Sequence, residues 1–201
     1  GSNILFEDAG YRGAVINVSA MKSAIGILEN ICFPGKDPAL TYDAVVVGAD
    51  KMLSSLCMTA LENSLTGLEF AYGIPGTVGG AVYMNAGAYG GEMKDVLVSV
   101  RYLTAEGESV EVPAEQLDLS YRHSAFSDTD CVVIGCELQL QRGDPREIDL
   151  SLLDVLKEVG FNRLSLGVQD FDKSVQVAVN RVQDNDFIRA LLMRAKELGF
   201  R

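Results

Sequence analysis

A glycine-rich segment at residues 65–92, reading LTGLEFAYGIPGTVGGAVYMNAGAYGGE, constrains this chain more than any other feature. It holds eight of the twenty glycines, and each glycine in an ordered element costs about 0.5–1 kcal/mol relative to alanine. A bound ligand can offset that cost, because backbone N–H groups without neighbouring side chains can reach a phosphate. The segment therefore predicts an anionic nucleotide cofactor. The alternative is that these glycines only build tight turns and close packing.

Neither standard phosphate-binding loop is present in the sequence. Gly73, Gly76, Gly79 and Gly80 do not follow the dinucleotide spacing G-x-G-x-x-G, and no Gly-Lys-Ser/Thr of a P-loop occurs. Glycine content alone therefore leaves both interpretations open.

The composition limits the size class and the kinds of partner. With 201 residues, 48% of them apolar, the chain can bury one full core, or one core with a small appendage. No apolar run reaches the roughly 18 residues of a membrane helix and no signal-peptide pattern is present, so a cytoplasmic location is expected. The net charge of -11 argues against a nucleic-acid partner and favours a small-molecule ligand.

The four cysteines carry no metal-binding pattern. Cys32, Cys57, Cys131 and Cys136 match neither a zinc-finger nor a CxxC spacing. We interpret them as buried or unreactive thiols and predict no metal site.

Charge and residue pattern both change near Gly143. Residues 1–143 carry 18 acidic and 8 basic side chains, whereas residues 144–201 carry 10 and 9. Short β-branched runs and glycine turns fill the first part, and amphipathic helical periodicity fills the second. We therefore predict an α+β domain with a mostly antiparallel sheet at residues 1–143, followed by a helix-rich region at residues 144–201.

The first part is expected to contain several strands and one helix. β-branched runs predict the strands, and Glu106-Gly107 marks a hairpin turn. Apolar residues at helical spacing predict a helix over Lys51–Ser64. The predicted strands are Ala14–Val18, Ala44–Val47, Val96–Leu103 with its hairpin partner Glu108–Val112, and Cys131–Leu140.

Three motifs follow one another along the chain: Gly1-Ser2-Asn3-Ile4-Leu5 with Tyr11-Arg12-Gly13, then the glycine-rich segment at residues 64–92, then Tyr121-Arg122-His123-Ser124. Together they resemble the MurB-type family of UDP-N-acetylenolpyruvoylglucosamine reductases. The first motif is similar to the family's GSNLL segment, the second resembles its glycine-rich segment almost residue by residue, and the third matches its YR-x-S motif. The resemblance covers residues 1–143 and implies an FAD-binding domain of the MurB/PCMH type.

This resemblance implies a set of FAD-binding residues, with NADPH as the hydride donor. Residues 1–5 and 73–80 are expected along the pyrophosphate and ribose, and residues 85–91 near the adenine half or the isoalloxazine ring. The expected cofactor-binding residues are Gly1, Ser2, Asn3, Ile4, Leu5, Gly73, Ile74, Pro75, Gly76, Thr77, Gly79, Gly80, Asn85, Ala86, Gly87, Ala88, Tyr89, Gly90 and Gly91.

Arg122 is the catalytic residue that the resemblance implies. In the family, a hydride passes from NADPH through the flavin to the enolpyruvyl carbon of a nucleotide-sugar substrate, giving UDP-N-acetylmuramate. A guanidinium is a permanently charged, bidentate donor that can stabilise the developing enolate beside the carboxylate. The alternative role for Arg122 is a surface salt bridge. His123, the only histidine, occupies the variable position of the motif and is not favoured as an acid or base.

Two segments of the family have no visible counterpart in this sequence. Family members carry a segment before the GSN motif that contributes to the FAD site. They also carry a C-terminal substrate domain that supplies a serine proton donor and a glutamate. Ser124 belongs to the YR-x-S motif and is not that serine. The complete reaction is therefore expected to be impaired in this chain.

Residues 144–201 resemble oxygen-independent coproporphyrinogen III oxidase, the HemN-type radical S-adenosylmethionine family. Helices are expected at Ile148–Val159 and Asp186–Leu198, with a strand at Arg163–Val168 between them. This order is typical of a fragment of a β/α barrel. The expected helix caps are Gly160, Gly199 and Asp184.

The second resemblance does not imply radical chemistry in this chain. Gln169 and Arg181 match residues that contact S-adenosylmethionine in that family. The sequence has no C-x-x-x-C-x-x-C run to hold a [4Fe–4S] cluster, so we interpret both residues as polar groups on a barrel fragment.

We therefore interpret the sequence as a chimera of two families. The leading hypothesis is a MurB-type flavoprotein reductase. The alternatives are a non-catalytic hybrid without cofactor and a fragment of a porphyrin-pathway oxidase. Apolar residues of the tail are expected either to cap the flavin domain or to form a self-association surface. These residues include Leu152, Leu153, Val155 and Leu156.

Overall fold

The computed structural model describes residues 4–13, 15, 17–37, 40–158, 160–164 and 184–201. It divides the chain into two compact units, Gly1–Gly143 and Asp144–Arg201. None of the helices in the described ranges combines the length and the apolar character that a bilayer crossing requires.

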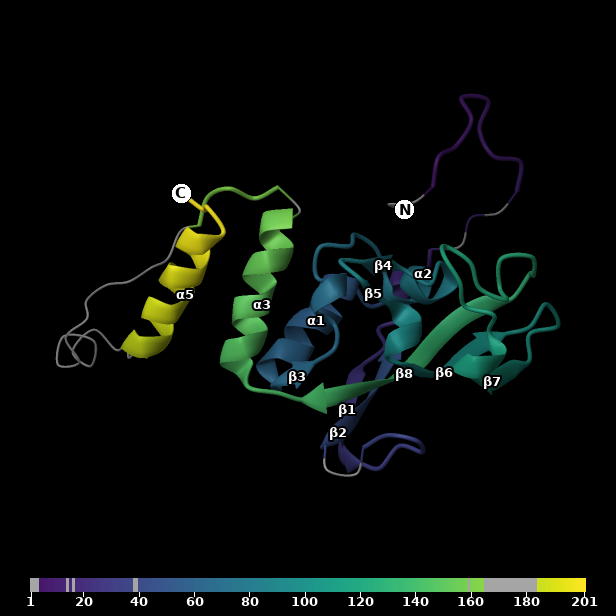
Figure 1. The fold of residues 1–201 in the computed structure, drawn as a ribbon. Helices are drawn as coiled ribbons and strands as arrows, with labels where there is room; N and C mark the ends of the chain where they lie inside the picture. The colour runs from purple at the N-terminus through teal and green to yellow at the C-terminus, as the bar shows by residue number, and fades with distance from the viewer. Residues whose placement is uncertain (1–3, 14, 16, 38–39, 159, 165–183) are drawn as a thin grey trace. The chain divides into compact units, whose positions relative to one another are not determined.

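A six-stranded antiparallel sheet forms the framework of the first unit (Figure 1). Five strands follow the order β1-β2-β8-β6-β7, and β3 pairs with the last residues of β8. This arrangement confirms the predicted α+β class with a mostly antiparallel sheet. The strands are β1 (Ile25–Ile31), β2 (Tyr42–Gly48), β3 (Leu65–Thr66), β6 (Leu97–Leu103), β7 (Ser109–Pro113) and β8 (Val132–Arg142).

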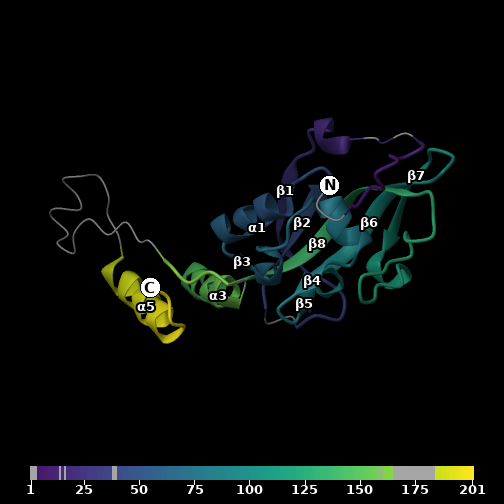
Figure 2. The same cartoon turned by 90° about the horizontal axis from the view of Figure 1, so that it is seen from above.

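Two helices, α1 (Leu53–Glu62) and α2 (Val78–Tyr83), lie over one face of this sheet (Figures 1 and 2). Apolar residues recur along α1 at helical spacing, which places them on one side of the helix. Alternate residues of β2 and β8 point to the same side and complete the core. The largest fully buried side chains are Leu53, Leu56, Leu65, Met93, Leu138, Leu140, Val45, Val47, Val78, Val82 and Val100.

Short elements carry much of the chain between α1 and β6. A separate two-stranded hairpin is formed by β4 (Gly87–Ala88) and β5 (Gly91–Glu92). The short 3-10 helices of the unit are η1 (Val18–Ala20), η2 (Glu69–Ala71), η3 (Met93–Asp95) and η4 (Ala114–Gln116).

Most predicted elements of the first unit are confirmed. The helix predicted at residues 51–64 contains α1, and the strands predicted at residues 44–47, 96–103 and 131–140 correspond to β2, β6 and β8. The predicted hairpin joins β6 to β7, and Gly107 at its turn has a positive φ of +85°. Glycine is favoured there because a side chain strains this conformation.

The strand predicted at Ala14–Val18 is wrong in the residues that the structure describes. Val15 and Asn17 lie in no strand and are exposed. The Asn17 side chain accepts a hydrogen bond from Ser19 N–H at 2.9 Å. This local bond caps η1 and favours a helical turn over an extended chain.

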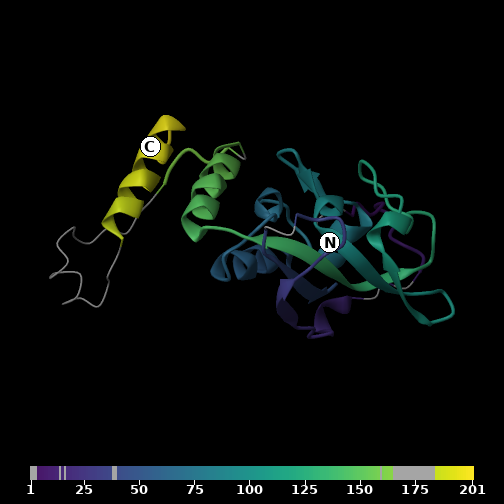
Figure 3. The same cartoon turned by 60° about the horizontal axis from the view of Figure 1, so that its bottom comes forward.

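The described part of the second unit contains two helices, α3 (Pro145–Glu158) and α5 (Asn185–Glu197), which lie side by side (Figure 3). They confirm the two helices predicted there. Arg194 of α5 forms an ion pair with Asp154 of α3, with 2.5 Å between Nη2 and Oδ1. Leu153, of the predicted apolar stripe, is buried.

The predicted helix caps are also confirmed. Gly160 and Gly199 have φ values of +100° and +73°, and the amide after each glycine donates to a carbonyl five residues earlier. The Asp184 side chain accepts hydrogen bonds from the N–H groups of Asp186 and Phe187.

The strand predicted at Arg163–Val168 is wrong where it can be compared. Arg163 and Leu164 lie in no strand. Leu164 N–H donates instead to Arg201 O, at the end of the chain. Residues 165–168 lie outside the described residues, as do Gln169 and Arg181.

Candidate functional site

The loop at residues 73–77 lies between η2 and α2 and is joined by an antiparallel bridge to the start of α1. In this bridge Leu53 N–H donates to Gly76 O at 3.0 Å, and Val78 N–H donates to Lys51 O at 2.8 Å. The loop is therefore held against the N-terminal end of α1.

The three amides in the first turn of α2 have partners inside the protein. Val78 N–H is engaged in the bridge, Gly79 N–H donates to Ala49 O at 3.0 Å, and Gly80 N–H donates to Thr77 Oγ1 at 3.4 Å. These amides are already satisfied and so do not indicate a phosphate site at the N-terminal end of α2.

Close packing explains three of the expected cofactor-binding glycines. A Cβ atom would lie 2.7 Å from the Ala49 Cβ at Gly79, 2.7 Å from Gly91 O at Gly87, and 2.9 Å from the Phe70 ring at Gly91. These separations are shorter than van der Waals contact, so each position needs glycine for packing alone. Close packing therefore accounts for glycine at these three positions without a ligand.

Four other glycines of the segment are left with open surroundings or a positive φ. A Cβ atom at Gly80 would meet only Thr77 Oγ1, at 3.7 Å, and one at Gly90 would meet none of the described atoms within 4 Å. Gly73 is exposed, whereas Gly76 is half-buried and its φ of +136° by itself favours glycine. A ligand could therefore approach the backbone closely at Gly73, Gly80 and Gly90.

Substitution of a close-packed glycine and substitution of a glycine beside open space should have opposite effects on stability. We expect Gly79→Ala to lower the free energy of unfolding by about 1–3 kcal/mol, because the new methyl overlaps Ala49. Gly80→Ala is the matched control in the same helix, and we expect it to be neutral or to stabilise by up to about 1 kcal/mol. Urea denaturation followed by tyrosine fluorescence measures both. Equal effects of the two substitutions would contradict this division.

The other expected cofactor-binding residues of the segment differ in access. Ile74 and Ala86 are half-buried against the core, and Ala88 is half-buried in β4. Pro75 and Tyr89 are exposed, and Tyr89 has a φ of +53°. The side chains of Pro75 and Tyr89 are therefore accessible to a ligand, whereas Ile74 and Ala86 support the core.

The N-terminal group of expected residues is only partly described. Gly1, Ser2 and Asn3 lie outside the described residues. Ile4 and Leu5 are exposed, and Leu5 leaves 97% of its surface accessible. These apolar side chains are available for burial under a ligand or another segment.

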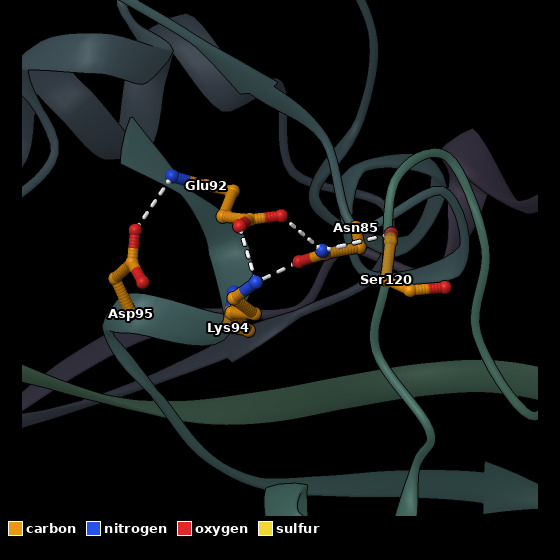
Figure 4. A network of polar contacts seen from close by, with 5 residues as sticks. All are labelled: Asn85, Glu92, Lys94, Asp95 and Ser120. Atoms are coloured by element: carbon orange, nitrogen blue, oxygen red, sulfur yellow. Dashed lines mark hydrogen bonds and ion pairs between the residues drawn. The ribbon is translucent and has the colours of Figure 1, made fainter. Parts of the chain in front are cut away.

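Asn85 was expected near the cofactor, but its side chain is buried inside the protein, with 2% of the residue exposed (Figure 4). Its Nδ2 donates to Glu92 Oε2 at 2.5 Å and to Ser120 O at 3.0 Å. Its Oδ1 accepts from Lys94 N–H at 2.9 Å. Both amide hydrogens and one of the two acceptor positions of this side chain are therefore engaged inside the protein.

Glu92 is the charged centre of this network. Lys94 Nζ pairs with Glu92 Oε1, and this hydrogen bond is the main reason why the pKa of Glu92 lies below its ordinary value of 4.5. The hydrogen bond from Asn85 lowers the pKa further. A depressed pKa in the folded state means that ionised Glu92 stabilises the fold above pH 4.5. That contribution is lost as the pH falls through the folded pKa.

We therefore expect Glu92→Gln to lower the melting temperature at pH 7 and to have a smaller effect at an acidic pH below the folded pKa of Glu92, where the wild-type carboxylate has lost its charge. Thermal unfolding at both pH values measures this difference. Glu62→Gln, at an exposed position of α1, is the control and should shift the melting temperature little at either pH. A Glu92→Gln effect that stays constant with pH would contradict the prediction.

Arg122 lies in a two-residue turn. Ser120 N–H donates to His123 O, and His123 N–H donates to Ser120 O, both at 3.2 Å. Arg122 has a φ of +53°, and its exposed guanidinium lies 5.7 Å from the centroid of the Tyr121 ring. Among the described residues this guanidinium forms no ion pair, which leaves it available to an anionic ligand. His123 instead faces Asp118, with 3.7 Å between Nε2 and Oδ2.

The cysteines are all unpaired and differ in burial. Cys57 and Cys136 are buried, and desolvation raises the pKa of each thiol to about 12. The interpretation as buried, unreactive thiols is confirmed for these two. Cys131 is half-buried, and Cys32 is exposed.

Comparison with known proteins places the sequence near one group of enzymes. Residues 1–113 match the family described as FAD binding domain. The chain is 46% identical over 142 residues to UDP-N-acetylenolpyruvoylglucosamine reductase of Agathobacter rectalis, covering 70% of this chain and 44% of that protein. It is 43% identical over 156 residues to the protein of the same name from Clostridioides difficile, covering 78% and 47%.

A solved structure is similar in fold. The crystal structure of UDP-N-acetylenolpyruvylglucosamine reductase (MurB) from Thermus caldophilus aligns with a TM-score of 0.53 at 24% identity, covering 76% of this chain and 68% of that one. This chain spans about half the length of the curated relatives described above.

Proposed function

Because the chain belongs to the family of FAD binding domains, we propose that its first unit is the FAD-binding part of a UDP-N-acetylenolpyruvoylglucosamine reductase. The proposed reaction is the NADPH-dependent reduction of UDP-N-acetylglucosamine enolpyruvate to UDP-N-acetylmuramate. The observation that carries the proposal is the high identity to curated reductases over a stretch long enough to include most or all of the first unit.

The residues present fit FAD in part. Gly73, Gly80 and Gly90 offer exposed backbone that a phosphate or a ring could approach. The exposed apolar side chains at residues 4–6 could cover the flat face of a ring. We therefore assign cofactor contact to the open positions of the loop at residues 73–77, to Gly80 and to the tip of the β4–β5 hairpin.

When bound, FAD supplies hydride transfer. In the proposed site, the Arg122 guanidinium holds the carboxylate of the nucleotide-sugar substrate and stabilises negative charge as it develops on the enolpyruvyl group. Arg122 cannot give up a proton at neutral pH, so the proton that completes the reduction must come from another group. By resemblance, that group belongs to a substrate domain that has no counterpart in residues 1–143.

Three further expectations stand as proposals. The substrate is a small nucleotide sugar, and the reaction takes place in the cytoplasm. Residues 144–201 derive from a HemN-type oxidase and provide a helical cap or a self-association surface. Size-exclusion chromatography with light scattering tests self-association, and a monomer at high concentration would argue against it.

A flavin titration tests the proposed function. We expect the full chain to quench FAD fluorescence with a one-to-one end point. We also expect Gly80→Ala to weaken binding about tenfold, or 1.4 kcal/mol, because its methyl occupies open space beside the loop. Gly26→Ala is the control, since a Cβ atom there would meet only Val46 O, at 4.0 Å, on an edge strand. Absence of binding, or equal binding by both variants, would overturn the proposal.

A further inference from the structure

The turn that carries Arg122 is anchored at both ends to residues at the C-terminal end of α2 and just after it. On the N-terminal side, Ser120 O accepts a hydrogen bond from Asn85 Nδ2 at 3.0 Å. On the C-terminal side, the buried Ser124 Oγ donates to Tyr83 O at 2.6 Å. Tyr83 and Asn85 are two residues apart, so one short stretch of chain at the end of α2 holds both sides of the turn.

The Asn85 anchor depends on an unusual backbone conformation. Asn85 has a φ of +40°, in the left-handed region that side chains other than Asn and Asp rarely adopt. In this conformation its amide reaches Glu92, Lys94 N–H and Ser120 O together (Figure 4). Asparagine is suited to the position because it tolerates the backbone and supplies two donors and an acceptor.

Ser120 O is also the acceptor for His123 N–H, the hydrogen bond that closes the turn around Arg122. The bond from Asn85 therefore fixes the same carbonyl that sets the direction of the turn. In the part of the chain that the structure describes, the exposed Arg122 guanidinium stacks on Tyr121 and forms no ion pair, so few contacts hold it in place. The position of the guanidinium thus depends on the anchors of the turn.

From this geometry we infer that Asn85 is a positioning residue for Arg122, tying the turn of the catalytic candidate to the glycine-rich segment. The inference rests on the proposed function for the role of Arg122. Asn85 acts through the Ser120 carbonyl and touches neither cofactor nor substrate. This positioning role differs from the cofactor contact that the resemblance implies for Asn85.

Two substitutions separate the backbone from the hydrogen bonds. Asn85→Gly accommodates the positive φ and removes the side chain. Asn85→Asp keeps the size and an acceptor for Lys94 N–H, but sets a carboxylate oxygen against Glu92 and Ser120 O. Thr66→Val is the control for general destabilisation, because it removes the hydrogen bond from Thr66 Oγ1 to Glu69 elsewhere in the unit.

The experiment measures three properties of the full chain. FAD affinity comes from fluorescence quenching, the order of the Arg122 backbone and Nε comes from heteronuclear NOE on nitrogen-15-labelled protein, and kcat and KM come from NADPH oxidation. We expect both Asn85 variants to keep FAD affinity within about threefold, to lose order at Arg122 and to lower kcat about tenfold or more. Thr66→Val should leave the Arg122 signals unchanged even if this variant has a lower melting temperature.

The NMR measurement does not require catalytic turnover. Failure of the proposed reaction and failure of this inference can therefore be told apart. Ordered Arg122 signals in both Asn85 variants would overturn the inference. A loss of FAD affinity beyond about tenfold would also overturn it, because Asn85 would then act on the cofactor. Loss of Arg122 order in Thr66→Val to the same degree would assign the effect to general destabilisation and likewise reject it.

Discussion

Replacing Arg122 with alanine is expected to lower kcat for reduction of UDP-N-acetylglucosamine enolpyruvate about 10²–10³-fold, while FAD affinity stays within about threefold. The guanidinium is exposed, stacks on Tyr121 and forms no ion pair with any described residue, so its removal should change the free energy of unfolding little. Its proposed role is to stabilise charge that develops on the substrate, and that role is absent from cofactor binding. Steady-state kinetics and flavin titration measure the two effects separately.

The backbone at Arg122 requires a matched control. A φ of +53° strains arginine and alanine alike by roughly 1 kcal/mol, whereas glycine adopts it freely. Arg122→Gly should therefore lose as much activity as Arg122→Ala while relieving this strain. Arg122→Lys keeps the charge without the bidentate geometry and should fall between wild type and alanine. A weakening of FAD binding beyond about tenfold in the glycine variant would reassign Arg122 to the cofactor.

Much of the fold could be predicted from local patterns. The strands β2, β6 and β8 are β-branched runs, and α1 has a clear apolar stripe. β1 escaped prediction because Gly26, Glu29 and Asn30 interrupt its apolar alternation. It lies at an edge of the sheet and pairs with β2, the next strand along the chain, so its formation depends on that pairing and not on its own residue pattern.

The candidate site was predictable by segment but not by residue. Glycine density located the segment, yet it could not separate Gly79, which packs against Ala49, from Gly80, which borders open space. That distinction depends on a strand-to-helix connection about thirty residues earlier in the chain. The same holds for Asn85, whose partner Ser120 lies 35 residues away. Tertiary contacts of this kind leave no periodic signal in the sequence.

A second large effect is expected at Arg142, at the end of β8. Asp43 is fully buried, and its Oδ1 accepts from Asn30 N–H at 2.9 Å and from Arg142 Nε at 3.3 Å. Its Oδ2 lies 2.9 Å from Arg142 Nη2, its only charged partner among the described residues. The guanidinium also pairs with the exposed Glu29 at 3.1 Å. Arg142 therefore neutralises a carboxylate that water cannot reach.

We expect Arg142→Ala to lower the free energy of unfolding by about 3 kcal/mol, because it leaves the Asp43 carboxylate buried with only the Asn30 amide. We expect the lower end of the usual range because the Arg142 side chain is 39% exposed, so water can enter part of the space that the guanidinium leaves. All seven tyrosines lie in residues 1–143, so tyrosine fluorescence during urea denaturation reports on the first unit alone.

Two comparisons isolate the buried pair from surface charge. Arg101→Ala removes an exposed arginine from the neighbouring strand β6 and should change stability by no more than about 0.5 kcal/mol. Glu29→Ala removes only the exposed partner of Arg142 and should cost less than about 1 kcal/mol. If Arg142→Ala were no more destabilising than these two, the ion pair would not be what holds β2 to β8 at this end of the sheet.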